Sequence, residues 1–263
     1  MCRFFAYQGE PISIADLVCT PVNSLLQQSR CAQEGKTTRN EDGFGIGWYN
    51  ELPEPWRRSG VAAAWANDGI RNACDDLQSR LFFAHVRAST GTMVSQANCH
   101  PFAHHQWLFM HNGQIGGYEH IQEAVEAMIP KKIAPARRGT TDSEAIFLAA
   151  FGNGLPADPI AVIIETLARI QTLAISASIA EPIRFSAALT DGTTLYAFRW
   201  ASDGRAPRIY YRNTPTGLVI ASEPSDGSRQ KWFEIANGCT LIARAGSAPT
   251  VQSFGAKPMR TAA

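Results

Sequence analysis

The sequence has no CxxC pair, no strong excess of charge and no long run of uncharged apolar residues. Its six cysteines are scattered over 263 residues, without the spacing of a disulfide scaffold or a zinc finger. A formal net charge of +1 gives no broad electrostatic field, so we expect neither nucleic acid nor a membrane as a partner. Together these absences favour a protein of a reducing compartment, the cytoplasm.

The composition is otherwise that of a globular protein, with 45% hydrophobic and 18% charged residues, which excludes disorder and collagen-like repeats. The start of the chain carries one basic residue and no long apolar segment, so we expect no secretory signal. The most apolar stretch, 160–180, contains Glu165 and Arg169. Its apolar residues recur with helical spacing, which predicts an amphipathic helix and not a membrane span.

Segments with strand-like patterns precede and follow a helical middle section. Strands are predicted within 4–7, 43–49, 61–66, 81–87 and 107–111, the last ended by an Asn112-Gly113 turn. Helical spacing is present in 24–33, 70–78, 118–129, 145–151 and 160–170. Further strands are predicted within 185–189, 194–199, 208–212, 218–221, 232–235 and 240–243. This order predicts one α+β domain over residues 1–263, with two sheets covered by helices, a core over about 2–243 and a loose tail over 247–263.

Cys2 is the second residue of the chain, and this position permits a particular chemistry. Methionine aminopeptidase removes Met1 when the next side chain is small, which would leave Cys2 with both a thiol and a free α-amine. The amine titrates near ~7.7–8.0 and the thiol near ~8.5, so one residue would supply both a general base and a nucleophile. The alternative is a small buried residue on an edge strand.

Three further segments place polar side chains at the ends of predicted elements. His85-Val86-Arg87 and His111-Asn112-Gly113 each end a strand, and Thr141-Asp142-Ser143-Glu144 begins a helix. Taken singly, Arg87 fits a surface charge at a strand end, and Asp142 fits a helix cap.

In this order behind Cys2, the three segments resemble the class II glutamine amidotransferases, which are N-terminal-nucleophile hydrolases. Segments 42–49, 98–102 and 221–224 are similar to the small stand-alone YafJ-like branch of that family. The resemblance covers residues 2–243. It implies a four-layer αββα sandwich, in which two antiparallel sheets pack face to face with helices outside.

The resemblance also implies a role for each residue. Cys2 would attack the carbonyl carbon of a γ-glutamyl amide, with its own α-amine as general base. The side chain of Asn112 and the backbone N–H of Gly113 would stabilise the oxyanion. Arg87 would bind the α-carboxylate of the substrate and Asp142 its α-ammonium group. A Cys2 thioester would form, and its hydrolysis would release glutamate, with no metal and no cofactor.

Two departures from the large amidotransferases match the stand-alone branch. Ala88 stands where a tryptophan often follows the arginine, and Arg3-Phe4-Phe5 stands where Gly-Ile is common. The length also leaves no room for a synthase domain, so we expect a small-molecule γ-glutamyl substrate that releases ammonia or an amine. Two alternatives stay open: an ammonia-supplying subunit of a partner synthase complex, and a non-catalytic binder of glutamate-like ligands. The sequence does not indicate an oligomeric state.

Other patterns favour structural interpretations. The glycine-rich run 43–47 has no Lys-Ser/Thr after it, so it predicts close packing in a sheet and not a phosphate loop. One group of cysteine and histidine residues has no standard zinc spacing, and we expect no metal site there: Cys99, His100, His104, His105 and His111. Four basic residues predict a solvated loop: Lys131, Lys132, Arg137 and Arg138.

Overall fold

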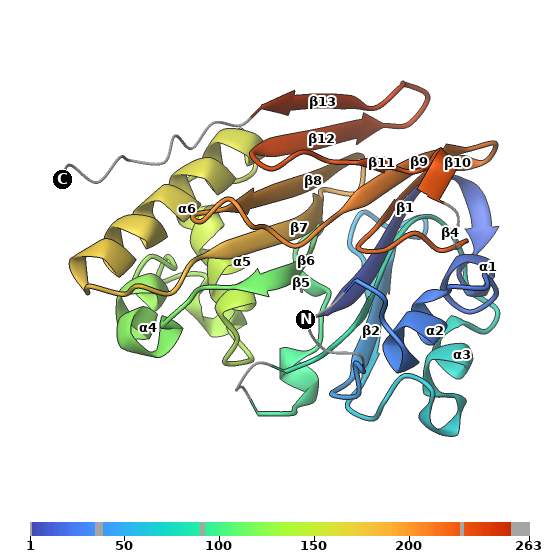
Figure 1. The fold of residues 1–263 in the computed structure, drawn as a ribbon, viewed down its shortest axis with the longest axis horizontal. Coiled ribbons are helices and arrows are strands. Elements are labelled where there is room, and N and C mark those ends of the chain that lie inside the picture. The colour runs from blue at the N-terminus through green and yellow to red at the C-terminus, as the bar shows by residue number, and fades with distance from the viewer. Residues whose placement is uncertain (1, 35–38, 90–92, 227–228, 254–263) are drawn as a thin grey trace.

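A computed structural model describes residues 2–34, 39–89, 93–226 and 229–253, and it contains two antiparallel sheets (Figure 1). The strands of the first sheet are β1 (Arg3–Ser13), β2 (Phe44–Trp48), β3 (Trp56–Gly60), β4 (Gln78–Val86), β9 (Tyr210–Thr214), β10 (Gly217–Ala221) and β11 (Phe233–Glu234). Those of the second are β5 (Phe102–His104), β6 (Trp107–Gln114), β7 (Arg184–Thr190), β8 (Thr194–Ala201), β12 (Cys239–Arg244) and β13 (Thr250–Ser253). The strand orders are β11-β9-β10-β1-β4-β2-β3 and β13-β12-β8-β7-β6-β5.

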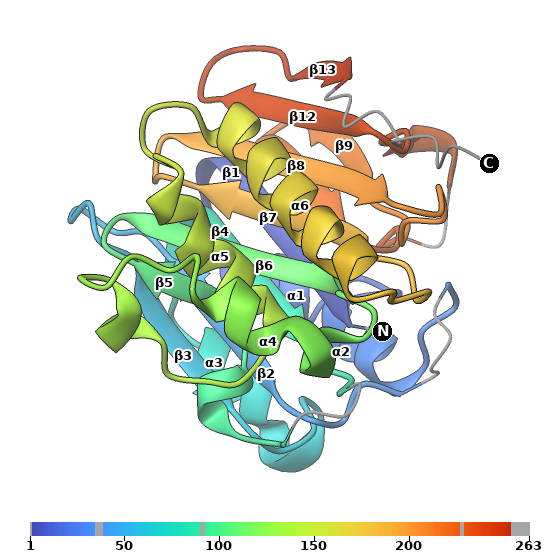
Figure 2. The ribbon, with the colours of Figure 1, turned by 90° about the vertical axis from the view of Figure 1, so that its left-hand side faces the viewer.

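Helices cover the outer face of each sheet. The helices are α1 (Ile14–Val18), α2 (Leu25–Arg30), α3 (Gly69–Cys74), α4 (Tyr118–Glu126), α5 (Asp142–Gly152) and α6 (Pro159–Ser176), with short 3-10 turns at Ala66–Asp68, Gln96–Asn98, Ala134–Ala136 and Arg229–Lys231. Helices α1 to α3 lie on the first sheet, and α4 to α6 lie on the second, as the two views show (Figures 1 and 2). The predicted four-layer αββα sandwich is confirmed.

The core between the sheets is built by strict alternation along the strands. On β1, Phe4 and Ala6 point into this interlayer core, whereas Phe5 packs under the helices of the first sheet. On β6, Leu108 and Met110 point into the same interlayer core. A side chain at a strand end therefore faces the same layer as the residues two and four positions away along that strand, which we call residues of the same parity.

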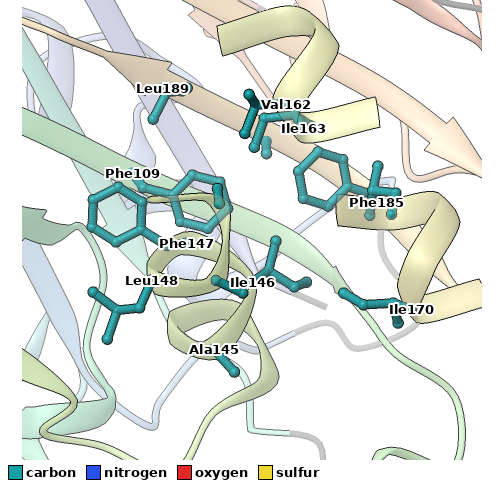
Figure 3. Close-up of a cluster of buried hydrophobic side chains, with 14 of the residues drawn as sticks. Phe109, Ala145, Ile146, Phe147, Leu148, Val162, Ile163, Ile170, Phe185 and Leu189 are labelled. Carbon is teal, nitrogen blue, oxygen red and sulfur yellow. The ribbon is translucent and has the colours of Figure 1, made fainter. Parts of the chain in front are cut away.

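The second sheet is joined to its helices by an aromatic and aliphatic cluster (Figure 3). Phe109 of β6 stacks on Phe147 of α5, with ring centroids 5.3 Å apart and an interplanar angle of 3°. Ile163 and Ile170 of α6 reach the same cluster. Helix α6 has the length and composition of a membrane span, yet one face is buried here and its charged residues are exposed. The predicted amphipathic helix is confirmed.

The close packing predicted for the glycine-rich run is also confirmed. A Cβ atom on Gly45 would lie 2.1 Å from the backbone oxygen of His100, and one on Gly47 would lie 2.7 Å from Cγ of Pro101. Strand β2 thus lies directly against the segment that leads into β5.

Three local predictions are wrong. The strand predicted at 61–66 lies instead at β3. Its partner β2 begins at Phe44, which pairs with Gly60, so the residues after Gly60 have no β2 residue opposite them. The predicted Asn112-Gly113 turn is part of β6, because β7 extends far enough to pair with both residues. The expected loose tail contains β13, which pairs with β12, while 254–263 lie outside the described residues.

Candidate active site

Cys2 lies immediately before β1, the central strand of the first sheet (Figure 1). The alternation that turns Phe4 and Ala6 inward gives Cys2 the same parity, so its side chain belongs to the interlayer face. Cys2 is half-buried, and its Sγ donates to the backbone oxygen of Ala88 at 3.6 Å. The thiol therefore lies beside the end of β4, the neighbouring strand.

A buried ion pair anchors this end of the chain. Arg3 Nε lies 3.3 Å from Glu223 Oε2, and each side chain is only 2% exposed. Arg3 Nη1 also donates to the backbone oxygen of Cys2 at 2.8 Å. The Glu223 carboxylate accepts further hydrogen bonds from Asn23 Nδ2 and from the backbone N–H groups of residues 33 and 34, at 3.0 to 3.2 Å. The sequence analysis gave neither Arg3 nor Glu223 a role, although 221–224 was part of the family resemblance.

Burial and nearby positive charge shift the pKa of the Cys2 thiol in opposite directions. Burial raises the pKa of the Cys2 thiol above its usual value, and the positive charges of Arg87 and Arg3 oppose that rise. Because burial is the larger influence, the thiol is protonated at neutral pH. A nucleophile in this state needs a base to accept its proton.

Arg87 follows β4 and has the parity of Leu81 and Phe83, which lie in the interlayer core. It is 3% exposed, so the surface-charge interpretation is wrong. Its guanidinium donates to the backbone oxygens of Asp42 and Met93, at 3.4 Å each, and to Ser89 Oγ at 3.3 Å. These contacts hold a planar cation in place next to Cys2.

Asn112 lies on β6 opposite Ser186 of β7 and has the parity of Leu108 and Met110, so its side chain also belongs to the interlayer face. It is 1% exposed, and its Oδ1 has no hydrogen-bond partner among the described residues. Asn112 and Arg3 line one cavity, which places them at the same end of the sandwich. Gly113 points the other way, where a Cβ atom would lie 1.9 Å from the backbone oxygen of Arg184.

Asp142 begins α5, but Thr141 caps the helix, since Thr141 Oγ1 accepts from the Glu144 N–H at 3.2 Å. Asp142 Oδ2 accepts from the Ile115 N–H at 2.7 Å, and its Oδ1 accepts from the Ser143 N–H at 2.7 Å. The carboxylate thus ties the helix N-terminus to the chain just after Gly113. A negative charge at this position is also favoured by the helix dipole.

The structure therefore brings Cys2, Arg87 and Asn112 to one end of the interlayer. Gly113 follows Asn112 in the chain, but a side chain at that position would face the helices, and Asp142 lies at the end of a helix behind β6. The network around Glu223 that holds Arg3 could not be detected in the sequence, because Glu223 lies 220 positions from Arg3 and 200 from Asn23.

Two buried histidines pack against each other beside this site. The ring centroids of His85 and His100 lie 4.3 Å apart at an interplanar angle of 31°, and neither His100 nitrogen has a hydrogen-bond partner within the described part of the chain. Burial lowers the pKa of His85 to about 3, so its imidazole is neutral at physiological pH. Across residues 2–34, 39–89, 93–226 and 229–253, no three His, Cys, Asp or Glu side chains are grouped to hold a metal ion.

The basic loop is only partly solvated. Lys131 and Lys132 are exposed as expected, but Arg137 is 12% exposed and forms ion pairs with Glu126 at 2.8 Å and Glu144 at 3.2 Å. The expectation for Arg137 was wrong because two carboxylates on α4 and α5 compensate its charge.

Comparison with known proteins supports the resemblance. The family described as "Glutamine amidotransferases class-II" matches residues 16–216. The gamma-glutamyl-hercynylcysteine sulfoxide hydrolase of Mycolicibacterium smegmatis is 30% identical over 230 residues, which are 86% of this chain and 88% of that protein. The probable glutamine amidotransferase DUG3 of Saccharomyces cerevisiae is 36% identical over 156 residues, 56% of this chain and 44% of the yeast protein. The chain thus spans less than half the length of the yeast relative.

Solved structures agree on the fold. A glutamine aminotransferase class-II domain protein from Silicibacter pomeroyi is 33% identical, has a TM-score of 0.77, and is matched over 97% of this chain and 100% of its own. The glutamine phosphoribosylpyrophosphate amidotransferase of B. subtilis has a TM-score of 0.68 at 13% identity, which shows the fold alone. Its match covers 98% of this chain and 50% of that protein.

The buried ion pair provides a stability test. Glu223→Gln removes the counter-charge of buried Arg3, and we expect the free energy of unfolding to fall by about 3–5 kcal/mol. Urea denaturation measures this change. The matched control is Glu234→Gln, whose carboxylate is 41% exposed beside Arg199, and which should cost less than about 1 kcal/mol. Equal losses in the two variants would contradict the anchoring role of Glu223.

The buried imidazole of His85 predicts a pH dependence of stability. An ordinary histidine in the unfolded chain takes up a proton below about pH 6.5, whereas folded His85, with a pKa of about 3, does not. The unfolded state thus binds more protons in this window, and stability falls as pH falls, by about 1.4 kcal/mol per pH unit for one histidine. His85→Phe should reduce this slope between pH 6 and pH 4.5, measured by urea denaturation. His120→Phe, at a side chain 70% exposed, should keep the wild-type slope; an unchanged slope in His85→Phe would refute the assignment.

Proposed function

Because the chain belongs to the class II glutamine amidotransferases, we propose that it hydrolyses the amide bond of a γ-glutamyl compound between the ends of its two sheets. The observation that carries the proposal is the position of Cys2. A thiol on the second residue lies on the same interlayer face as a buried guanidinium, that of Arg87, and a buried carboxamide, that of Asn112.

The reaction begins with the thiol proton. Removal of Met1 exposes the α-amine of Cys2, which accepts this proton, and Sγ attacks the carbonyl carbon to form a C–S bond. Asn112, through its side-chain NH₂, and Gly113, through its backbone N–H, stabilise the oxyanion of the tetrahedral intermediate. Loss of one such donor raises a barrier by about 2.7–4 kcal/mol. The raised pKa of Cys2 supports the need for an adjacent base.

The intermediate collapses when the C–N bond breaks. The α-ammonium group of Cys2 returns its proton to the leaving nitrogen, which departs as ammonia or an amine. Water then attacks the thioester, with the amine again accepting a proton. This step releases glutamate and restores the Cys2 thiol. The balance of atoms needs only water, and no metal or cofactor takes part.

Substrate recognition is assigned to two charged residues, Arg87 and Asp142. Arg87 binds the α-carboxylate, because its fork can make two parallel hydrogen bonds to a carboxylate. Asp142 accepts from the α-ammonium group. Each of its oxygens already accepts one backbone N–H and keeps further lone-pair capacity. The contacts that fix both side chains before substrate arrives support these roles.

Two relatives indicate the range of substrates. The yeast relative is a probable glutamine amidotransferase, and the Mycolicibacterium relative hydrolyses a γ-glutamyl sulfoxide. Both names are consistent with a small-molecule γ-glutamyl substrate and differ in the leaving group. We place the reaction in the cytoplasm, because the nucleophile must stay a free thiol, as Cys2 is in the structure. An ammonia-supplying subunit and a non-catalytic glutamate binder are the rival proposals.

Labelling with 6-diazo-5-oxo-norleucine tests the nucleophile. Its glutamine-like end requires the substrate pocket, and its diazoketone alkylates an activated thiol. Intact-mass spectrometry with peptide mapping should find one adduct, on Cys2 of a chain without Met1. Cys31 is exposed and provides an internal control that should stay unlabelled.

Equal labelling of Cys31 and Cys2, or no adduct on a chain that lacks Met1, would contradict the proposal. A chain that is labelled but releases glutamate only with a second protein would favour the ammonia-supplying subunit. Binding of glutamine without any thioester would favour the non-catalytic binder.

Arg87→Lys tests recognition of the α-carboxylate. Lysine keeps the charge but not the planar fork, so we expect KM for γ-glutamyl substrates to rise about tenfold, with a smaller change in kcat. Steady-state kinetics of glutamate release measures both constants. Arg80→Lys, on the exposed side of the same strand, is the matched control and should behave as wild type. An unchanged KM in Arg87→Lys would remove the proposed role.

A further inference from the structure

A cavity adjoins the candidate active site at Arg3 and Asn112, which both line it. It measures about 520 Å³ and is lined by four arginines and one glutamate among mostly small or neutral residues. The charged residues of the lining are Arg3, Arg184, Arg205, Arg208 and Glu34. The proposed mechanism gives no role to Arg184, Arg205, Arg208 or Glu34.

The positive charges of this lining are compensated unequally. Arg3 pairs with Glu223, and Arg184 Nη2 lies 2.8 Å from Asp203 Oδ2. Arg208 lies 3.6 Å from Glu34 and 3.9 Å from Glu234, and its side chain also interacts with Tyr210. Arg205 is exposed and forms no ion pair with any residue that the structure describes. Among the described lining residues, Arg205 therefore offers a positive charge on which an anion can bind without displacing an ion pair.

Buried atoms of the lining also lack partners. Arg3 Nη2, Arg184 Nε and Asn112 Oδ1 are buried without a hydrogen bond to any described residue. Arg3 itself is only 2% exposed. Buried donors and acceptors are normally satisfied, so these three atoms indicate that polar groups from outside the chain occupy this space.

The orientation of the bound substrate follows from which residues surround its glutamyl group and which surround its leaving group. The glutamyl end is assigned to Arg87, held by Asp42, Ser89 and Met93, and to Asp142 at the start of α5. Neither residue lines the cavity. With the scissile carbonyl between Cys2 and Asn112, the glutamyl chain extends toward Arg87. The group on the amide nitrogen must extend elsewhere, and the cavity shares Asn112 with the site.

We propose that this arginine-lined cavity receives the leaving group of the γ-glutamyl substrate and selects one that carries a carboxylate, such as an amino acid or a short peptide. The inference rests on the proposed function, because it uses the same scissile bond. Arg205 and Arg208 bind the carboxylate, and glutamine, whose leaving group is ammonia, gains nothing from them. Glutamine is then a weaker ligand than a γ-glutamyl peptide.

The test measures binding, so that it does not depend on turnover. The full chain with Cys2→Ala is titrated by calorimetry with γ-glutamylglycine, γ-glutamylglycinamide and glutamine. The two dipeptides differ only in the terminal carboxylate. We expect γ-glutamylglycine to bind about tenfold more tightly than the amide, as for one charge-assisted contact. Arg205→Gln should reduce this ratio severalfold, and Arg205→Gln with Arg208→Gln should bring it to about one, with the dissociation constant for glutamine unchanged in both.

Arg244→Gln is the control, since Arg244 is exposed and lies outside the cavity. It should keep the wild-type ratio. Equal binding of all three ligands would overturn the inference and leave the proposed function intact. A preference for the carboxylate that survives both arginine substitutions would overturn the assignment to this cavity. If no ligand binds at all, the proposed function fails, and the inference fails with it.

Discussion

The ion pair between Arg3 and Glu223 is the constraint on which the site depends. A chain terminus ordinarily frays, because few contacts hold its first residues. Here the third residue carries a buried charge, and a buried charge is tolerated only with a partner and further hydrogen bonds. Glu223 supplies the partner, and its own carboxylate is held by Asn23 and by backbone N–H groups near residue 33. Once this network forms, the backbone of Cys2 is fixed by a direct bond from Arg3.

The layered fold then determines what faces the thiol. In each sheet the side chains alternate between the interlayer core and the helices, so a residue at a strand end inherits its direction from the core residues before it. The buried positions of Phe4, Met110 and Phe83 in the interlayer core thus determine the side-chain directions of Cys2, Asn112 and Arg87, respectively. Packing of apolar side chains thus orients three polar ones at the same end. The tilted pair of neutral imidazoles, His85 and His100, continues the core up to the site without adding charge.

Much of this arrangement could be predicted from local patterns, and the failures have physical causes. The position of Cys2, the helix start at Thr141 and the amphipathic pattern of α6 are local, and the sequence analysis found them. The Asn112-Gly113 pair looked like a turn, but pairing with β7 overrides that preference. Glu223 and the pairing of Arg137 with Glu126 and Glu144 could not be inferred, since they depend on which distant segments meet.

The two ends of the proposed substrate are built by separate parts of the chain. The glutamyl end is assigned to the strand end at Arg87 and to the start of α5, where Asp142 also binds the N–H of Ile115, just after Gly113. The leaving-group end is assigned to the start of β7, the loop before β9, Gln33 and Glu34. Under the proposed mechanism, changes in that loop would alter the leaving group without disturbing the proposed nucleophile, Cys2, or the proposed oxyanion donors. In this chain, our proposal assigns a preference for negative charge at that end to the arginines of the loop before β9.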